Sequence, residues 1–253
     1  MDLNQYLRDV PPHLAILRFL FKDVPLRSIL DIGCCEGEDS LRYLREFPLA
    51  VVHAFEPYPK NISRIKKLIG SDYHPRFKLI EAAVSDANGM ATLSISSGQP
   101  PEASESTGWD YGNKSSSLLP PAALMFRHHP WLKFSRNLQV QTITLDYFAL
   151  AYRIDNIDFM HIDIQGAELR AFSSAKSLLR RTGVIWVEVS DHQIYKDQPN
   201  SEAISEFLSS LGFVLILKSV SEGFGDHLYV NPGYFHVSRH DLVGDPLLKE
   251  LGE

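Results

Sequence analysis

The stretch that decides the fold is SILDIGCCEGEDS, residues 28–40. Its apolar first half predicts a buried strand, and glycines at positions 33 and 37 predict a tight turn before a helix that begins near Glu38. The next apolar run, AVVHAFEP at residues 50–57, predicts a second strand that ends at Pro57. The sequence therefore predicts a β-α-β unit whose first turn is rich in glycine.

The alternation of strands and helices continues along the chain. Further strands are predicted at 77–85 (FKLIEAAVS), 157–164 (IDFMHIDI), 183–190 (GVIWVEVS), 213–220 (FVLILKSV) and 226–232 (DHLYVNP). Helices are predicted at 38–47, 61–70, 167–181 and 201–212, the second with Asn61 as its N-cap and Gly70 at its C-terminal end. Strands and helices that alternate at this spacing indicate an α/β fold, a mostly parallel sheet covered by helices on both faces.

The domain organisation predicted from length is a single domain, residues 1–253. Residues 1–27 form an N-terminal helical segment, in which HLAILRFLF (13–21) has apolar residues at helical spacing and docks on the core. Residues 96–138 interrupt the alternation with a stretch rich in Ser, Gly and Pro that also carries five aromatic residues of the Phe, Tyr and Trp types. We expect this insertion to be a partly ordered lid over a substrate site, and a flexible insertion is the alternative.

Composition and charge disfavour several classes of protein. The chain has 25 Lys and Arg against 31 Asp and Glu, a net charge of −6, so it lacks the basic surface expected of a nucleic-acid-binding protein. Its two cysteines are adjacent and unsuited to a disulfide, which indicates a reducing, cytoplasmic location. The apolar run at 13–21 is broken by Arg18 and too short for a membrane span. The oligomeric state is left open.

The glycine turn excludes two kinds of phosphate-binding loop. It has no lysine between positions 33 and 40, as a P-loop would need, and Cys35 stands where a dinucleotide fingerprint needs its second glycine. The turn also carries four carboxylates that would repel a pyrophosphate, those of Asp31, Glu36, Glu38 and Asp39. A cationic nucleoside without phosphate, S-adenosyl-L-methionine, fits this charge pattern.

A ribose acceptor stands at the predicted distance from the turn. Glu56 ends the second strand about 20 residues after the glycines, where a carboxylate accepts hydrogen bonds from both ribose hydroxyls. This spacing suits NAD as well as S-adenosyl-L-methionine, and the turn decides between them. The purely structural alternative is a tight strand-to-helix turn whose acids Glu38 and Asp39 stabilise the start of a helix.

The sequence resembles the FkbM family of class I methyltransferases. The resemblance rests on ILDIGCCEG, VVHAFEPYP, IEAAVSDANGMATLSIS, SSSLL, ITLDYF, IDFMHIDIQGAEL and VIWVEVS, in the order of the family. It implies a Rossmann-like, seven-stranded, mostly parallel sheet with an antiparallel last strand and S-adenosyl-L-methionine as cofactor. It also implies methylation of a hydroxyl on a carbohydrate or small natural product. His161 departs from the family, which more often has lysine there.

The resemblance assigns most of the candidate cofactor-binding residues. Asp31, Gly33 and Gly37 belong to the turn around the methionine moiety, and Glu56 holds the ribose. The segment around Ala83 meets the adenine through backbone groups. The complete set of candidate cofactor-binding residues is Asp31, Gly33, Cys34, Gly37, Ser40, Glu56, Pro57, Ala83 and Asp163.

Methyl transfer to a hydroxyl needs an aligned acceptor and a group that removes its proton. The candidate catalytic residues are Asp163, Glu188, His192 and His161, which lie in or after two predicted central strands. Asp163 is the first candidate, either as the base or as a partner of the cofactor's ammonium. His161 could instead be a buried core histidine. Glu168 is equally a helix-start acid and a site residue.

Three alternatives remain open at this point. Asp163, Glu188, Asp191 and His192 could converge on a divalent cation, but no compact ligand spacing supports this, so we expect no metal site. A Rossmann-type NAD-dependent oxidoreductase requires the turn to accept a pyrophosphate. A non-catalytic module that keeps the fold for binding a partner is the third.

Overall fold

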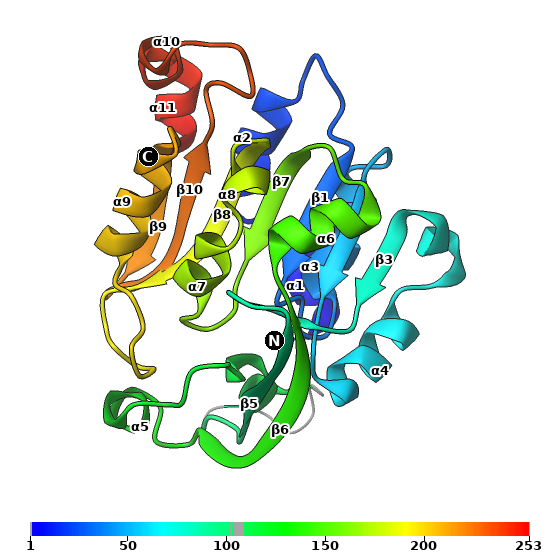
Figure 1. Ribbon diagram of the computed structural model, residues 1–253, viewed down its shortest axis with the longest axis vertical. Coiled ribbons are helices and arrows are strands. Elements are labelled where there is room, and N and C mark those ends of the chain that lie inside the picture. The colour runs from blue at the N-terminus through cyan, green and yellow to red at the C-terminus, as the bar shows by residue number, and fades with distance from the viewer. Residues whose placement is uncertain (1, 102, 104–108, 253) are drawn as a thin grey trace.

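A computed structural model describes residues 2–101, 103 and 109–252 (Figure 1). Its main sheet has seven strands in the order β3-β2-β1-β7-β8-β10-β9. These strands are β1 (Ser28–Ile32), β2 (Val51–Phe55), β3 (Phe77–Ile80), β7 (Ile157–Ile162), β8 (Thr182–Ser190), β9 (Val214–Ser221) and β10 (Phe224–Val230). Strand β10 pairs antiparallel with β8 and β9, and the remaining pairs are parallel. The predicted mostly parallel sheet with an antiparallel last strand is confirmed.

Helices cover both faces of this sheet, because successive side chains of each buried strand point to opposite sides. Ile29 and Phe159 face one helical layer, and Leu30 and Met160 face the other. The first layer contains α2 (His13–Leu20), α3 (Glu38–Glu46), α4 (Pro59–Leu68), α10 (Arg239–Gly244) and α11 (Pro246–Gly252). The second contains α6 (Leu145–Tyr152), α7 (Glu168–Ser173), α8 (Lys176–Leu179) and α9 (Ser201–Ser210). In the part of the chain that the structure describes, no helix has the length and hydropathy needed to cross a bilayer.

A second sheet of three strands, in the order β4-β6-β5, lies beside the carboxyl ends of the main sheet (Figure 1). Its strands are β4 (Ala83–Val84), β5 (Gly89–Ser97) and β6 (Lys133–Ile143). The single strand predicted at 77–85 is therefore wrong: β3 ends at Ile80, and β4 belongs to the second sheet. Both pieces are apolar, so the pattern did not reveal the change of sheet.

The insertion at 96–138 contains a 3-10 helix, η3 (Tyr111–Ser115), and a short helix, α5 (Ala123–His128). It also holds the end of β5 and the first half of β6. Residues 102 and 104–108 lie outside the described part of the chain. The described apolar residues Leu119, Met125 and Leu132 pack with Ile194 and Tyr195, which follow β8. The insertion is therefore seated against the loop at the carboxyl end of a central strand.

Two predicted helix boundaries are wrong. Helix α4 begins at Pro59, with proline in its first turn, and ends at Leu68, so Asn61 is a buried residue inside the helix and not its N-cap. The predicted helix at 167–181 is divided into α7 and α8. The N-terminal segment also has two helices, because α1 (Leu3–Arg8) precedes α2.

The glycine turn after β1 packs directly against the end of β7. Gly33 has a φ of +84°, and a Cβ built on it would lie 1.8 Å from the backbone oxygen of Asp163. The amide of Asp163 in turn donates to the carbonyl of Ile32, 3.0 Å away. Gly37 also has a positive φ, +89°, but its added Cβ would meet only the side chain of Ile65, at 3.3 Å. Of these two glycines of the turn, only Gly33 has the backbone of another segment in the space of a side chain.

We predict that Gly33→Ala destabilises the fold by about 3 kcal/mol or more, because the methyl group forces β1 and β7 apart. Gly37→Ala is the matched control: it has the same left-handed strain but a flexible neighbour, and should cost about 1–2 kcal/mol. Urea unfolding of both variants measures the difference. Equal losses of unfolding free energy in the two variants would show that glycine is needed at position 33 only for its positive φ, and not for the close contact with Asp163.

Candidate functional site

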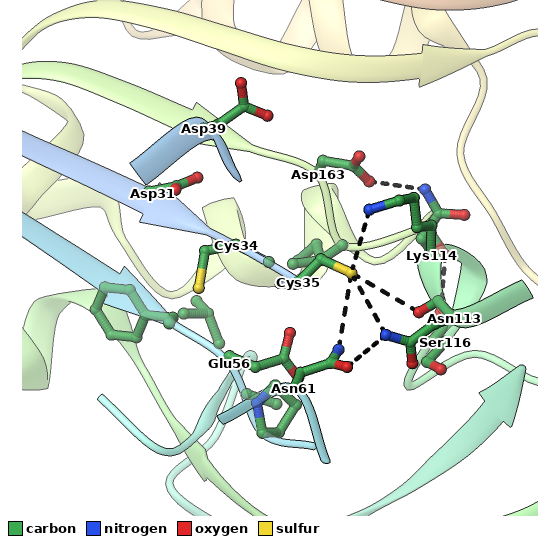
Figure 2. A pocket seen from close by; sticks show the side chains of 18 of the residues that line it. Asp31, Cys34, Cys35, Asp39, Glu56, Asn61, Asn113, Lys114, Ser116 and Asp163 are labelled. Atoms are coloured by element: carbon green, nitrogen blue, oxygen red, sulfur yellow. Dashed lines mark hydrogen bonds between the residues drawn. The ribbon is translucent and has the colours of Figure 1, made fainter. Parts of the chain in front are cut away.

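A cavity opens at the carboxyl ends of β1, β2 and β7, between the glycine turn and the insertion (Figure 2). Tyr6 of α1 and Trp109 of the insertion also line it. Of the candidate residues, eight line the cavity: Asp31, Gly33, Cys34, Glu56, Pro57, Ala83, His161 and Asp163. Four do not: Gly37, Ser40, Glu188 and His192. The cavity therefore collects most of the predicted set on three strands.

Asp31 is a buried carboxylate on β1 with two side-chain partners. The hydroxyl of Ser40 donates to Asp31 Oδ2 at 2.5 Å, and His161 Nδ1 lies 3.3 Å from Asp31 Oδ1. Burial alone would lower the pKa of His161, but the hydrogen bond and charge of Asp31 raise it to about 9. Asp31 and His161 therefore form a charged pair in the cavity wall, and Ser40 supports it from behind.

Glu56 directly follows β2 and is only 5% exposed, yet it lines the cavity. Its Oε1 accepts a hydrogen bond from the amide of Tyr58 at 2.7 Å. Burial raises its pKa to about 7, although hydrogen bonds from Tyr58, Asn61 and Cys35 favour the charged form. A carboxylate in this setting gains by accepting further hydrogen bonds from a bound ligand.

The cavity beyond Glu56 is apolar. Its walls there come from the end of β2, the crossing between the two sheets, β5 and the insertion. The lining residues are Phe55, Ala82, Ala83, Val84, Leu93 and Leu118. A flat, apolar ring fits such walls, with backbone groups of the segment around Ala83 available at its edge.

The acids of the glycine turn have basic partners that the sequence did not reveal. Glu36 pairs with Arg64 of α4 and does not line the cavity. Glu38 Oε1 accepts from Lys114 Nζ of the insertion at 2.6 Å. Asp39 accepts from the hydroxyl of Tyr6 at 2.6 Å and from Arg42. Of the four acids of the turn, Glu36 therefore lies outside the cavity, whereas Glu38 pairs with the insertion and also lines the cavity together with Asp31 and Asp39.

The two cysteines occupy different environments. Cys34 is buried and packs on Ala54 and Ile65. Cys35 has a φ of +51°, and its Sγ lies 4.0 Å from Lys114 Nζ and 3.7 Å from Asn61 Nδ2 (Figure 2). Burial raises the pKa of both thiols, so neither is a reactive thiolate.

Three acidic side chains gather at the ends of β7 and β8. Single ligand atoms of Asp163, Glu168 and Glu188 lie within 4.8 Å of one another, close enough to hold a divalent cation. The amide nitrogen of Gln165 points to two of them, however, at 2.7 Å from Asp163 Oδ1 and 2.8 Å from Glu188 Oε2. Hydrogen bonds from this amide already stabilise the pair. Glu168 accepts from the backbone amides of Ile164 and Gly166, and burial raises its pKa to about 7.

Glu188 does not line the cavity and lies behind Asp163. Burial, followed by the charge of Asp163, raises the pKa of Glu188 well above its ordinary value. His192 lies farther along the loop, where its Nε2 is 2.9 Å from the carbonyl of Glu222 and its ring is near Phe224. The ring of His128, from the insertion, lies 5.0 Å from that of His192 at a tilt. Neither histidine lines the cavity.

Several site residues were missed in the sequence. Asn61 and Asn113 hydrogen bond to each other, 2.5 Å apart, and both line the cavity. Tyr195 hydrogen bonds to Gln165, and Asp226 of β10 lies opposite Glu188 of β8. Burial raises the pKa of Asp226 to about 7. Of these positions only Asn61 drew attention, and it was assigned to a helix cap. No local pattern marks a residue whose role depends on a contact between distant segments.

Comparison with known proteins agrees with this geometry. The family model of the methyltransferase FkbM domain matches residues 31–215. The 2-O-methyltransferase NoeI of Sinorhizobium fredii is 32% identical over 202 residues, which cover 80% of this chain and 78% of that protein.

Solved structures show more distant similarity. The N-terminal domain of EvdMO1 with SAH bound is 12% identical, with a TM-score of 0.47, over 88% of this chain and 81% of that one. An O-methyltransferase family protein from Burkholderia thailandensis is 10% identical, with a TM-score of 0.47, over 87% of this chain and 55% of that one.

The family model covers most of the chain, including the glycine turn, Glu56 and the Asp163 segment. The oxidoreductase and the non-catalytic module are not favoured by this match. The chain belongs to the FkbM methyltransferase family and is a methyltransferase that uses S-adenosyl-L-methionine as its cofactor.

Proposed function

We propose that this protein transfers a methyl group to a hydroxyl of a carbohydrate or small natural product. The observation that carries the proposal is the position of Asp163, a carboxylate in the cavity wall beside the glycine turn. A carboxylate at this position lies beside the space proposed for the methyl acceptor, so it can receive the proton of the acceptor hydroxyl. The name of the relative NoeI, a 2-O-methyltransferase, supports oxygen as the acceptor atom.

The cavity residues fit the cofactor from end to end. Glu56 accepts the ribose hydroxyls, and the apolar walls around Ala83 and Leu93 enclose the adenine. Asp31 and the turn at Gly33 lie beside the methionine end, and Cys34 and Pro57 add backbone to the wall. Ser40 and Gly37 support the turn from outside the cavity. When bound, the cofactor supplies an activated methyl group on a positively charged sulfur.

Asp163 is the group we assign to the acceptor proton. Its Oδ1 is held by the amide of Gln165, and Glu188 lies on the other side of that amide. The hydroxyl proton would move to Asp163 as the acceptor oxygen takes the methyl group, whose bond to the cofactor's sulfur breaks and leaves its electron pair on that sulfur. Glu188, which accepts from the same Gln165 amide, would share the change in charge. His161 is assigned to the wall of the cavity, where its positive charge offsets Asp31. His192 receives no catalytic role.

The insertion at 96–138 is proposed as the lid of the acceptor site in a single domain of residues 1–253. Lys114 binds Glu38, and its Nζ lies 4.4 Å from the centre of the Trp109 ring, so the segment is attached across the cavity. The N-terminal helical segment, residues 1–27, contributes Tyr6 to the same wall. Two free cysteines without a disulfide support a cytoplasmic location.

Loss of the Glu56 carboxylate should weaken cofactor binding. Glu56→Gln keeps the shape but removes a charged acceptor, which should raise the Kd for S-adenosyl-L-methionine about 10- to 100-fold. The control is Glu81→Gln, an exposed carboxylate that pairs with Lys66 outside the cavity. Titration calorimetry measures both. An unchanged Kd in Glu56→Gln would remove the ribose assignment.

Binding of the nucleoside should also depend on pH. The pKa of Glu56 is raised to about 7, so its charged form predominates above that pH and its protonated form below it. We expect methylthioadenosine, which lacks the titrating amino-acid end, to bind more weakly as the pH falls from about 8 to about 6. The dependence should flatten in Glu56→Gln. An equal pH dependence in both proteins would assign the effect to another group.

Replacement of Asp163 separates its two possible roles. Asp163→Asn should lower kcat about 100- to 10,000-fold if the carboxylate accepts the proton, with little change in cofactor affinity. If it holds the ammonium of the cofactor, the same variant should mainly raise the Kd. The kcat is measured as transfer of labelled methyl groups to a panel of monosaccharides and oligosaccharides. The Kd for the cofactor is measured by calorimetry.

A further inference from the structure

The side-chain amide of Gln165 is placed between the two central carboxylates. Its Nε2 donates to Asp163 Oδ1 at 2.7 Å and to Glu188 at 3.0 Å and 2.8 Å, to Oε1 and Oε2. An amide nitrogen carries two hydrogens, enough to serve both groups at once. Reversal of the amide would instead turn its oxygen toward two acids. The orientation of this amide therefore decides whether the carboxylates are stabilised or repelled.

Tyr195 favours that orientation. Its hydroxyl lies 2.8 Å from Gln165 Oε1, and a phenol that donates there requires the amide oxygen to face it. Tyr195 is 1% exposed, so water does not compete for this contact. The backbone of Gln165 is held as well, because the hydroxyl of Ser117 donates to its carbonyl at 2.8 Å. Gln165 has a φ of +58°, a conformation that a non-glycine residue keeps only when its surroundings hold it.

Both contacts connect Gln165 to the insertion. Ser117 is part of the insertion and forms an isolated β-bridge with Ser94 of β5. The Tyr195 hydroxyl also lies 2.8 Å from the carbonyl of Ser115, although it has a single proton for its two acceptors. Tyr195 follows β8 and pairs with Pro121 of the insertion in another bridge. The position of the insertion therefore affects how the Gln165 amide is held against Asp163 and Glu188.

We propose that Gln165 is a positioning residue, oriented by Tyr195 and Ser117, which aims the Asp163 carboxylate at the methyl acceptor and connects it to the insertion. This inference rests on the proposed role of Asp163. Gln165 itself neither gives nor takes a proton. Other charged groups near the pair are Glu168 of α7, Asp226 of β10 and His161 of β7. Their carboxylates and imidazole do not contact the Gln165 amide.

The first test is Tyr195→Phe, which removes the hydroxyl and keeps the ring. We expect kcat for methyl transfer to fall about tenfold. The Kd for S-adenosyl-L-methionine should stay within about twofold of the parent protein. The matched control is Tyr229→Phe, which removes another buried hydroxyl, bonded to Ser205 and His227 away from the cavity. If both variants lose the same activity, or if cofactor affinity falls with kcat in Tyr195→Phe, the proposal is wrong.

The second test needs no acceptor. Hydrogen bonds donated to a charged carboxylate lower its pKa, so losing the oriented amide should raise the pKa of Glu188 further. We expect the protonated-carboxyl band in the infrared spectrum of the S-adenosylhomocysteine complex to persist to higher pH in Tyr195→Phe and in Gln165→Met. Tyr229→Phe should match the parent protein. An unshifted titration in Gln165→Met would overturn the proposal even if Tyr195→Phe failed to fold.

The two proposals fail in different ways. A folded parent protein that binds no S-adenosylhomocysteine, or whose Asp163→Asn variant retains full activity, contradicts the proposed function. The other case is a parent protein that binds S-adenosylhomocysteine and loses activity in Asp163→Asn. If Tyr195→Phe and Gln165→Met then have a normal kcat and a normal titration, only the role of Gln165 is contradicted.

Discussion

The close approach of Gly33 to the backbone of Asp163 is the constraint on which the site depends. A glycine at that point lets the turn after β1 touch the end of β7, where a Cβ would lie 1.8 Å from a carbonyl oxygen. The contact places Asp31, the turn and Asp163 around one cavity. Parallel strands bring their carboxyl ends to one edge, and this glycine removes the remaining space between two of them.

The acids of the glycine turn hold neighbouring elements in place. Glu36 and Glu38 bind Arg64 and Lys114, so part of the negative charge attaches α4 and the insertion around the cavity. Asp31, Glu38 and Asp39 also line the cavity. A loop with this charge distribution still excludes a pyrophosphate, because Cys35 occupies the backbone approach and the acids stay close. The prediction that the turn does not bind a pyrophosphate is therefore kept, although two of its four carboxylates, Glu36 and Glu38, also form ion pairs.

Neutral donors stabilise the buried acids at β7 and β8. These donors are the side-chain amide of Gln165 and the backbone amides of the loop between β7 and α7. Burial leaves Glu188 and Glu168 with raised pKa values, so protons remain in the cluster near neutral pH. Glu188 and Glu168 are thus the acids that favour the protonated form, and Asp163, which accepts from the Gln165 amide, is the proton acceptor that we propose.

The sequence by itself determined the alternation of strands and helices, the glycine turn, and the places of Glu56 and Asp163 at the ends of two strands. Each of these depends on a local pattern or on a fixed position relative to a strand. The prediction of one strand at 77–85 was wrong because this apolar run contributes to two sheets. The prediction of Asn61 as a helix N-cap was wrong because Asn61 lies inside α4. The sequence also favoured His192, whose neighbours in space are Glu222 and Phe224. Only the tertiary structure decided the partners of the acids and the roles of Gln165 and Tyr195. Their contacts join segments distant in the chain, and no local sequence pattern encodes them.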